Sequence, residues 1–177
     1  MSLRTLILGG VAVPLHSTLE LDQRYTVQQA VDRRRTANGD LHQRTTWTGK
    51  LATTINASGP IPPGLQALDY TGTLLLSCMQ HRAITSASNV ITLPAARRTD
   101  AGSLPYARAQ VMRGDVPEWV STGLAIVSNV ATLTPVAGAT AYQVLYFPEI
   151  TVYADPPTET RQARGGAFGW QLVAEEV

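Results

Sequence analysis

The sequence predicts an all-β protein, folded as an antiparallel β-sandwich or barrel-like structure with at most short helical turns. Apolar residues recur at every second position far more often than with the period of an α-helix. Glycine, proline and Asn-Gly pairs interrupt this alternation about every eight to twelve residues, the strand spacing typical of sandwiches and barrels. No segment beyond about one turn has the apolar stripe of an amphipathic helix.

The first half of the chain predicts a long hairpin. Between residues 19 and 28 apolar and polar side chains alternate, which is typical of a strand buried on one face. The pair Asn38-Gly39 predicts a type I′ turn, since both residues tolerate a positive φ. A return strand is expected over residues 41–48, and a separate strand over 51–56, after Gly49.

The segment 58–64 stops this pattern, because its three prolines remove backbone donors and fix φ. Short strands separated by turn residues are expected over the rest of the chain, at residues 71–80, 84–93 with a turn at 85–89, 106–113, 119–120, 124–127, 130–133, 141–147, 150–153 and 168–173. The 177 residues suit one domain, so we expect a single β-rich domain over 1–177, with extended arms at 58–65 and 155–167.

The composition excludes several functional classes. Apolar residues make up 44% of the chain, which argues against disorder, and the net charge of +1 provides no overall field for nucleic acid or anionic lipid. The apolar stretch over residues 6–13 is too short to span a bilayer, and we expect folding in a cytoplasm. Thirteen of the 14 basic residues are arginine, which is either an interface preference or the product of a GC-rich coding sequence.

No catalytic or metal-binding pattern stands out. Cys78 is the single cysteine, so we expect a buried thiol and no disulfide, and His16, His42 and His81 are too widely spaced for a local metal site. The chain lacks the GxSxG pattern, and pairing of its carboxylates depends on tertiary geometry. We therefore expect no enzyme activity, no metal and no cofactor. The string at 164–170 has a weak likeness to an RNA-binding pattern, in a protein that we do not expect to bind nucleic acid.

The remaining unusual features indicate a surface for partners. Arg33, Arg34 and Arg35 are brought close to other basic residues by the expected hairpin, where aspartates dilute their charge. A rigid proline segment loses little entropy on docking. The candidate interface residues are therefore Arg33, Arg34, Arg35, Pro60, Pro62, Pro63 and Trp170. A tryptophan in an alternating strand is, however, more often part of a core.

Several strings together resemble small structural proteins of tailed-bacteriophage tails, in particular a baseplate or tail-tip component of a long, flexible-tailed phage. The resemblance rests on residues 6–11, 45–51, 59–65 and 168–172, followed by an acidic tail. It implies β-sandwich or barrel modules that form rings around the tail axis, and it implies no catalytic residue. A second similarity, at residues 135–146, is to the end of one strand and the start of the next in fibronectin type III domains.

The sequence thus predicts a structural subunit of a phage tail tip or baseplate, in the virion tail, which associates with itself as a ring or other homo-oligomer and docks to other tail proteins. One alternative is a monomeric β-sandwich module that binds carbohydrate or a host-surface receptor through tryptophan and tyrosine. A hydrolase with a site assembled from loops is a third hypothesis.

Overall fold

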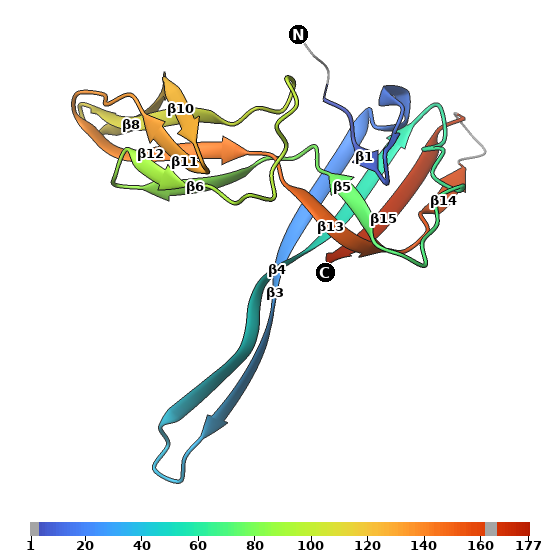
Figure 1. Cartoon of the computed structure of the whole chain (residues 1–177), viewed down its shortest axis with the longest axis horizontal. Helices are drawn as coiled ribbons and strands as arrows, with labels where there is room; N and C mark the ends of the chain where they lie inside the picture. Colours follow the sequence, from blue (N-terminus) through green and yellow to red (C-terminus); the bar gives the residue numbers. More distant parts are fainter. Residues whose placement is uncertain (1–3, 162–165) are drawn as a thin grey trace. The chain divides into compact units, whose positions relative to one another are not determined.

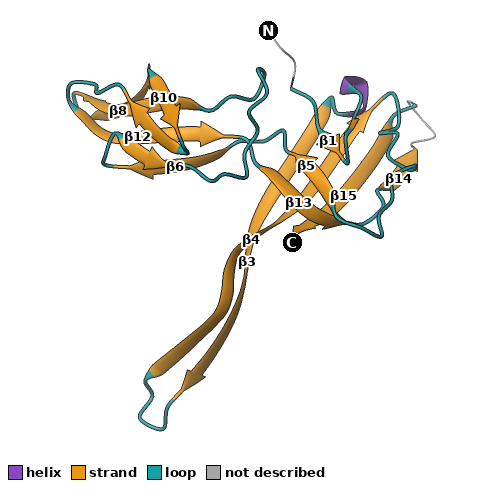
Figure 2. Ribbon diagram, in the orientation of Figure 1, coloured by secondary structure: helices purple, strands orange, loops and turns teal. Residues whose placement is uncertain are grey.

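The computed structural model describes residues 4–161 and 166–177 and confirms the all-β class (Figures 1 and 2). Within these residues, fifteen strands and one three-residue 3-10 turn form two compact units. Residues 1–6 and 77–150 make up unit 1, and residues 7–76 and 151–177 make up unit 2. The sequence predicted a single domain. The chain enters unit 2 after residue 6, leaves it within strand β5 (Leu74–Ser77) and re-enters it within strand β13 (Glu149–Ala154), so no loop marks the last two crossings in the sequence.

Unit 1 is a β-sandwich. A three-stranded sheet has the order β10-β11-β7, and a four-stranded sheet has the order β6-β12-β8-β9. Residues of both sheets form one core, with Ile91, Ala131 and Leu133 from the first and Ala109 and Val144 from the second. The strands are β6 (Arg82–Ser86), β7 (Val90–Thr92), β8 (Tyr106–Arg113), β9 (Val116–Thr122), β10 (Leu124–Val127), β11 (Val130–Leu133) and β12 (Ala139–Tyr146).

The segment 135–146, which the sequence likened to a strand end and a strand start of fibronectin type III domains, holds the loop after β11 and the whole of β12, because β11 already ends at Leu133. The Tyr142 hydroxyl accepts a hydrogen bond from the Val136 backbone N–H at 3.2 Å. This contact closes the corner between the two sheets in the manner of the tyrosine corner of immunoglobulin-like sandwiches.

Unit 2 is built on an eight-stranded sheet, in the order β2-β1-β5-β13-β15-β4-β3, with β14 paired to β15. Its core contains Ile55, Leu172 and Val152, which are all fully buried. The remaining elements are β1 (Ile7–Leu8), β2 (Val11–Ala12), the 3-10 turn η1 (Leu15–Ser17), β3 (Glu20–Arg35), β4 (Leu41–Gly59), β14 (Thr158–Arg161) and β15 (Phe168–Glu176).

The hairpin of β3 and β4 extends well beyond the other strands of unit 2 (Figure 1). Leu51 is the last buried residue of β4 on the way to the tip, and every residue from 32 to 50 is exposed. We call residues 28–50 the arm. At about 3.3 Å per residue, the paired part of the arm extends for about 25 Å.

The predicted extended arms differ from the arm in the structure. Within 58–65, Gly59 ends β4, and Pro63 and Leu65 are buried, so this segment packs on its own unit. Within 155–167, β14 pairs with β15, and residues 162–165 lie outside the described residues.

Candidate interaction surface

The predicted interface residues fall into three environments. Arg33, Arg34 and Arg35 lie near the tip of the arm and are exposed. Pro60 and Pro62 are exposed, whereas Pro63 is buried. These five exposed residues remain candidates for partner contact.

Trp170 belongs to the core of unit 2. Its side chain is 4% exposed, and its Nε1–H donates a hydrogen bond to the Ser17 carbonyl oxygen at 2.8 Å. Burial with a satisfied indole removes Trp170 from the predicted interface, in agreement with the core role that alternation favours.

The tip of the arm is a three-residue loop instead of the predicted two-residue type I′ turn. The Gly39 backbone N–H donates to the Thr36 carbonyl oxygen at 2.9 Å, and the Thr36 N–H donates to the Asp40 carbonyl oxygen at 2.9 Å. Gly39 has a φ of 87°, whereas Asn38 does not have a positive φ. This pattern is typical of a type I turn followed by a glycine bulge.

Two bulges interrupt the pairing near the base of the arm. Along β3 the partners pass from Gln28↔Lys50 to Gln29↔Thr48, which leaves Gly49 as an extra residue of β4. Gly49 has a φ of 89°, a conformation that glycine adopts without steric conflict. The sequence placed a strand end at this glycine, whereas β4 continues through it. A second bulge leaves Thr46 unpaired, and β3 itself is uninterrupted.

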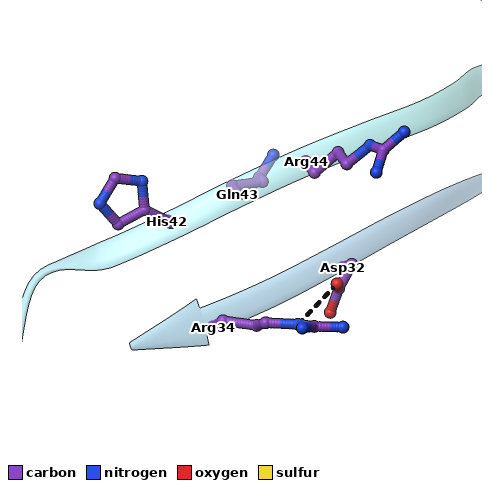
Figure 3. Close-up of a pocket in the computed structure, with 5 residues that line it drawn as sticks. All are labelled: Asp32, Arg34, His42, Gln43 and Arg44. Atoms are coloured by element: carbon purple, nitrogen blue, oxygen red, sulfur yellow. Dashed lines mark hydrogen bonds and ion pairs between the residues drawn. The ribbon is translucent and has the colours of Figure 1, made fainter. Parts of the chain in front are cut away.

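The arm is basic. Five basic and two acidic side chains between residues 28 and 50 give a net charge of +3, against +1 for the whole chain. Figure 3 shows Asp32 and Arg34 on β3, with His42 and Arg44 on the facing strand. Together with Gln43 these residues line an open hollow of about 340 Å³.

Polar side chains of the arm are held by contacts within the arm. The Arg34 Nε–H donates to the Asp32 carboxylate at 2.9 Å, and the Arg33 Nε–H donates to the Gln43 side-chain oxygen at 3.1 Å. Arg35 donates to the Gly39 carbonyl oxygen at 2.9 Å. The guanidinium groups are therefore oriented while they stay exposed, which leaves further N–H donors for a partner.

The arm also exposes large apolar side chains, with Val27 adjoining its base. The exposed fractions are 50% for Val27, 57% for Leu41 and 46% for Trp47. These fractions show that no other part of the described chain covers the three side chains. Exposed apolar groups beside oriented arginines are typical of the central part of a protein interface.

Groups with possible chemical roles are spread over both units. His16 lies in η1, His42 in the arm and His81 in unit 1. Partial burial lowers the pKa of His81, and the charges of Arg4 and Arg108 lower it further. Over the described part of the chain, no three His, Cys, Asp or Glu side chains gather as they would around a metal ion.

Three of the carboxylates have hydrogen-bond or ion-pair partners nearby. The Ser77 hydroxyl donates to Glu149 at 2.7 Å, and Arg113 forms an ion pair with Glu118 at 2.9 Å. Hydrogen bonds from the Thr71 hydroxyl and backbone N–H lower the pKa of Asp69. Glu149, Glu118 and Asp69 thus each have a local structural partner.

A second hollow of about 440 Å³ in unit 2 is lined by two aromatic and two acidic residues, Tyr70, Tyr153, Asp155 and Glu175, with two aliphatic neighbours. Tyr153 is 55% exposed, and the Tyr70 hydroxyl donates to the Leu65 carbonyl oxygen at 2.9 Å. Burial raises the pKa of Tyr70, and the charge of Glu159 adds to this shift.

No protein-family description, curated protein or solved structure matches this chain. Within residues 4–161 and 166–177, no helix has the length and apolar character needed to span a membrane.

Proposed function

We propose that this protein is a structural subunit of a phage tail tip or baseplate, which associates with itself and docks to neighbouring tail proteins. The sequence resemblance to tail components suggests the setting, and the exposed arm is the observation that carries the assembly role.

Ordering the arm costs conformational entropy. Fixing each residue opposes folding by about 1–2 kcal/mol, and burial of apolar surface normally offsets this term. The distal arm buries no large side chain, and a two-stranded ribbon alone in water is marginally stable. An ordered ribbon of this kind is stabilised when a partner covers it.

The experiment compares the wild-type protein with an armless variant. Gln29 and Thr48 are opposite each other, so replacing residues 30–47 by Asn-Gly closes the hairpin with a two-residue turn. We expect the variant to unfold at nearly the wild-type temperature, because the removed residues add nothing to the core. Light scattering after size exclusion should show self-association of the wild type and its loss in the variant, and only the wild type should co-purify with tail proteins.

Equal self-association and equal co-purification of the two proteins would contradict the assembly role of the arm. A wild type that is monomeric at all concentrations and enters no particle would contradict the proposed function as a whole.

The second candidate function is a monomeric module that binds carbohydrate or a host-surface receptor. The hollow that contains Tyr70 and Tyr153 favours it, since aromatic faces with nearby carboxylates can hold a polar ligand. A strict monomer that binds a glycan array, and loses this binding in Tyr153→Ala, would support this function. Binding that survives the substitution would exclude the hollow as the site.

A further inference from the structure

The outer edge of β3 is built to accept another strand. β3 is the terminal strand of its sheet, runs for 16 residues without a bulge, and contains no proline, glycine or lysine. Natural sheet edges are usually protected by short length, proline, a bulge or charged side chains, lysine above all. Of these devices β3 has only charged side chains, of both signs, so its pairing with a further strand depends on how those charges meet the charges of that strand.

Backbone geometry restricts how two copies of β3 can pair. In an antiparallel pair, residues directly opposite each other must both point their N–H and C=O groups toward the partner, or both away. When two copies of β3 pair, even-numbered residues therefore lie opposite even-numbered residues, and odd-numbered residues opposite odd-numbered ones. The two-fold axis then passes through one residue position that lies opposite itself.

The charge pattern selects that residue. With the axis at Gln28, Asp22 lies opposite Arg34 of the second copy, and Arg24 lies opposite Asp32 of the second copy. An axis one residue earlier places Asp22 opposite a second aspartate, and an axis one residue later places Arg24 opposite a second arginine. Opposite charges stabilise directly facing positions, and like charges destabilise them.

We propose that two copies of this chain associate by antiparallel pairing of their β3 edges about Gln28. The arm of each copy then lies along the β3 edge of the other copy's sheet. This inference rests on the proposed self-association and names the surface that produces it.

Contacts within one chain prepare the four charges. Arg24 pairs with Asp22 and Arg34 pairs with Asp32, both at 2.9 Å, and all four side chains are more than half exposed. In the paired copies each carboxylate lies between a guanidinium of its own strand and one of the second copy. Arginine, with five N–H donors, can serve both carboxylates.

The first test exchanges charges. Arg24→Asp places two aspartates opposite each other, and Asp32→Arg places two arginines opposite each other, so each variant alone should be monomeric where the wild type is dimeric. A mixture of the two should form a mixed dimer, because each aspartate then faces an arginine.

The double variant R24D/D32R separates this effect from contacts within one chain. It leaves like charges beside each other along the strand, yet it restores opposite charges across the pair, so dimerisation should return. Dimerisation unaffected by either single change, or not restored by mixing, would overturn the proposed register.

The second test uses the two-fold axis. Cys78 is fully buried, so an introduced cysteine is the accessible thiol among the described residues. Under mild oxidation Gln28→Cys should give a disulfide-linked dimer, since the two Cβ atoms face each other across the axis.

The matched control is Thr26→Cys, which lies on the same strand and the same face. Two Thr26 positions are separated by about 13 Å along the strand in this register, too far for a disulfide. It should form no homodimer, but it should crosslink to Ala30→Cys when the two variants are mixed.

Failure of this inference is distinguishable from failure of the proposed function. A wild type that self-associates, with no crosslink at Gln28 and no response to charge exchange, overturns the β3 pair and leaves assembly intact. A wild type that stays monomeric and enters no particle overturns both.

Discussion

Replacing Arg98 by methionine should be among the most destabilising single changes in unit 1. The guanidinium is 2% exposed, and it forms a bidentate pair with Asp100 at 2.8 and 3.1 Å. Its Nη1 also donates to the carbonyl oxygens of Thr5 and Cys78, at 2.8 and 3.1 Å. One side chain thereby joins the N-terminal segment, the end of β5 and the loop after residue 97.

The magnitude follows from the groups left without a partner. Methionine keeps much of the volume of arginine but removes the charged donor to the part-buried Thr5 carbonyl oxygen and to the buried Cys78 carbonyl oxygen, and each such hydrogen bond contributes about 1.5–3 kcal/mol. The Asp100 side chain is 51% exposed, so water can solvate its carboxylate and adds little to the loss. We expect the free energy of unfolding to fall by about 4 kcal/mol, the sum of the two lost hydrogen bonds.

Urea denaturation followed by circular dichroism measures this change. With a denaturant slope of about 2 kcal/mol per M, the midpoint of unit 1 should fall by about 2 M. Arg113→Met is the matched control, since Arg113 pairs with Glu118 at 2.9 Å while 74% exposed, and its loss should cost less than about 0.5 kcal/mol. Equal midpoints for the two variants would refute the assignment of Arg98 as a buried structural link.

Three further outcomes are expected. Hydrogen bonds from Arg98, and its charge, lower the pKa of Asp100 in the folded protein. The resulting stabilisation is fully present above the pKa of the unfolded state and is lost as the pH falls through the lower pKa of the folded state. Asp100→Asn should therefore reduce the loss of stability in acid, measured by thermal melts. Gly59→Ala should destabilise unit 2 by more than about 2 kcal/mol, since a Cβ there overlaps a backbone carbonyl of η1, whereas Gly72→Ala, with open space around it, should melt like the wild type. Tyr142→Phe should lower the stability of unit 1 by about 1 kcal/mol by removing the hydrogen bond to Val136, and an unchanged melt would show that the corner adds no stability.

Period-two alternation located most strands because burial of one face is a local signal. The predicted bounds 106–113, 124–127 and 130–133 are those of β8, β10 and β11. The division into two units was not predictable in this way. The chain crosses the boundary inside β5 and β13, whose residues must satisfy strand pairing and carry no linker composition.

The candidate surface was predicted in part. The run Arg33–Arg35 was singled out, and it lies on the arm. The sequence did not show that Pro63 is buried, and it left Trp170 open between interface and core, because the environment of both comes from residues distant in the chain. The arm itself has a weak signal, namely a hairpin turn flanked on both sides by segments with few apolar residues.

The distribution of apolar residues on the arm favours recognition through its edge. In the observed register, Val27 and Leu41 lie on one face of the ribbon, whereas Trp47, opposite Ala30, lies on the other. Neither face therefore offers a continuous apolar surface for another sheet or helix to cover. A strand that pairs along β3 gains backbone hydrogen bonds along its whole length and places its own side chains beside both faces at once. Edge pairing thus brings a partner beside the exposed groups on both faces of the arm. Docking on a single face would leave the apolar side chains of the other face exposed to water.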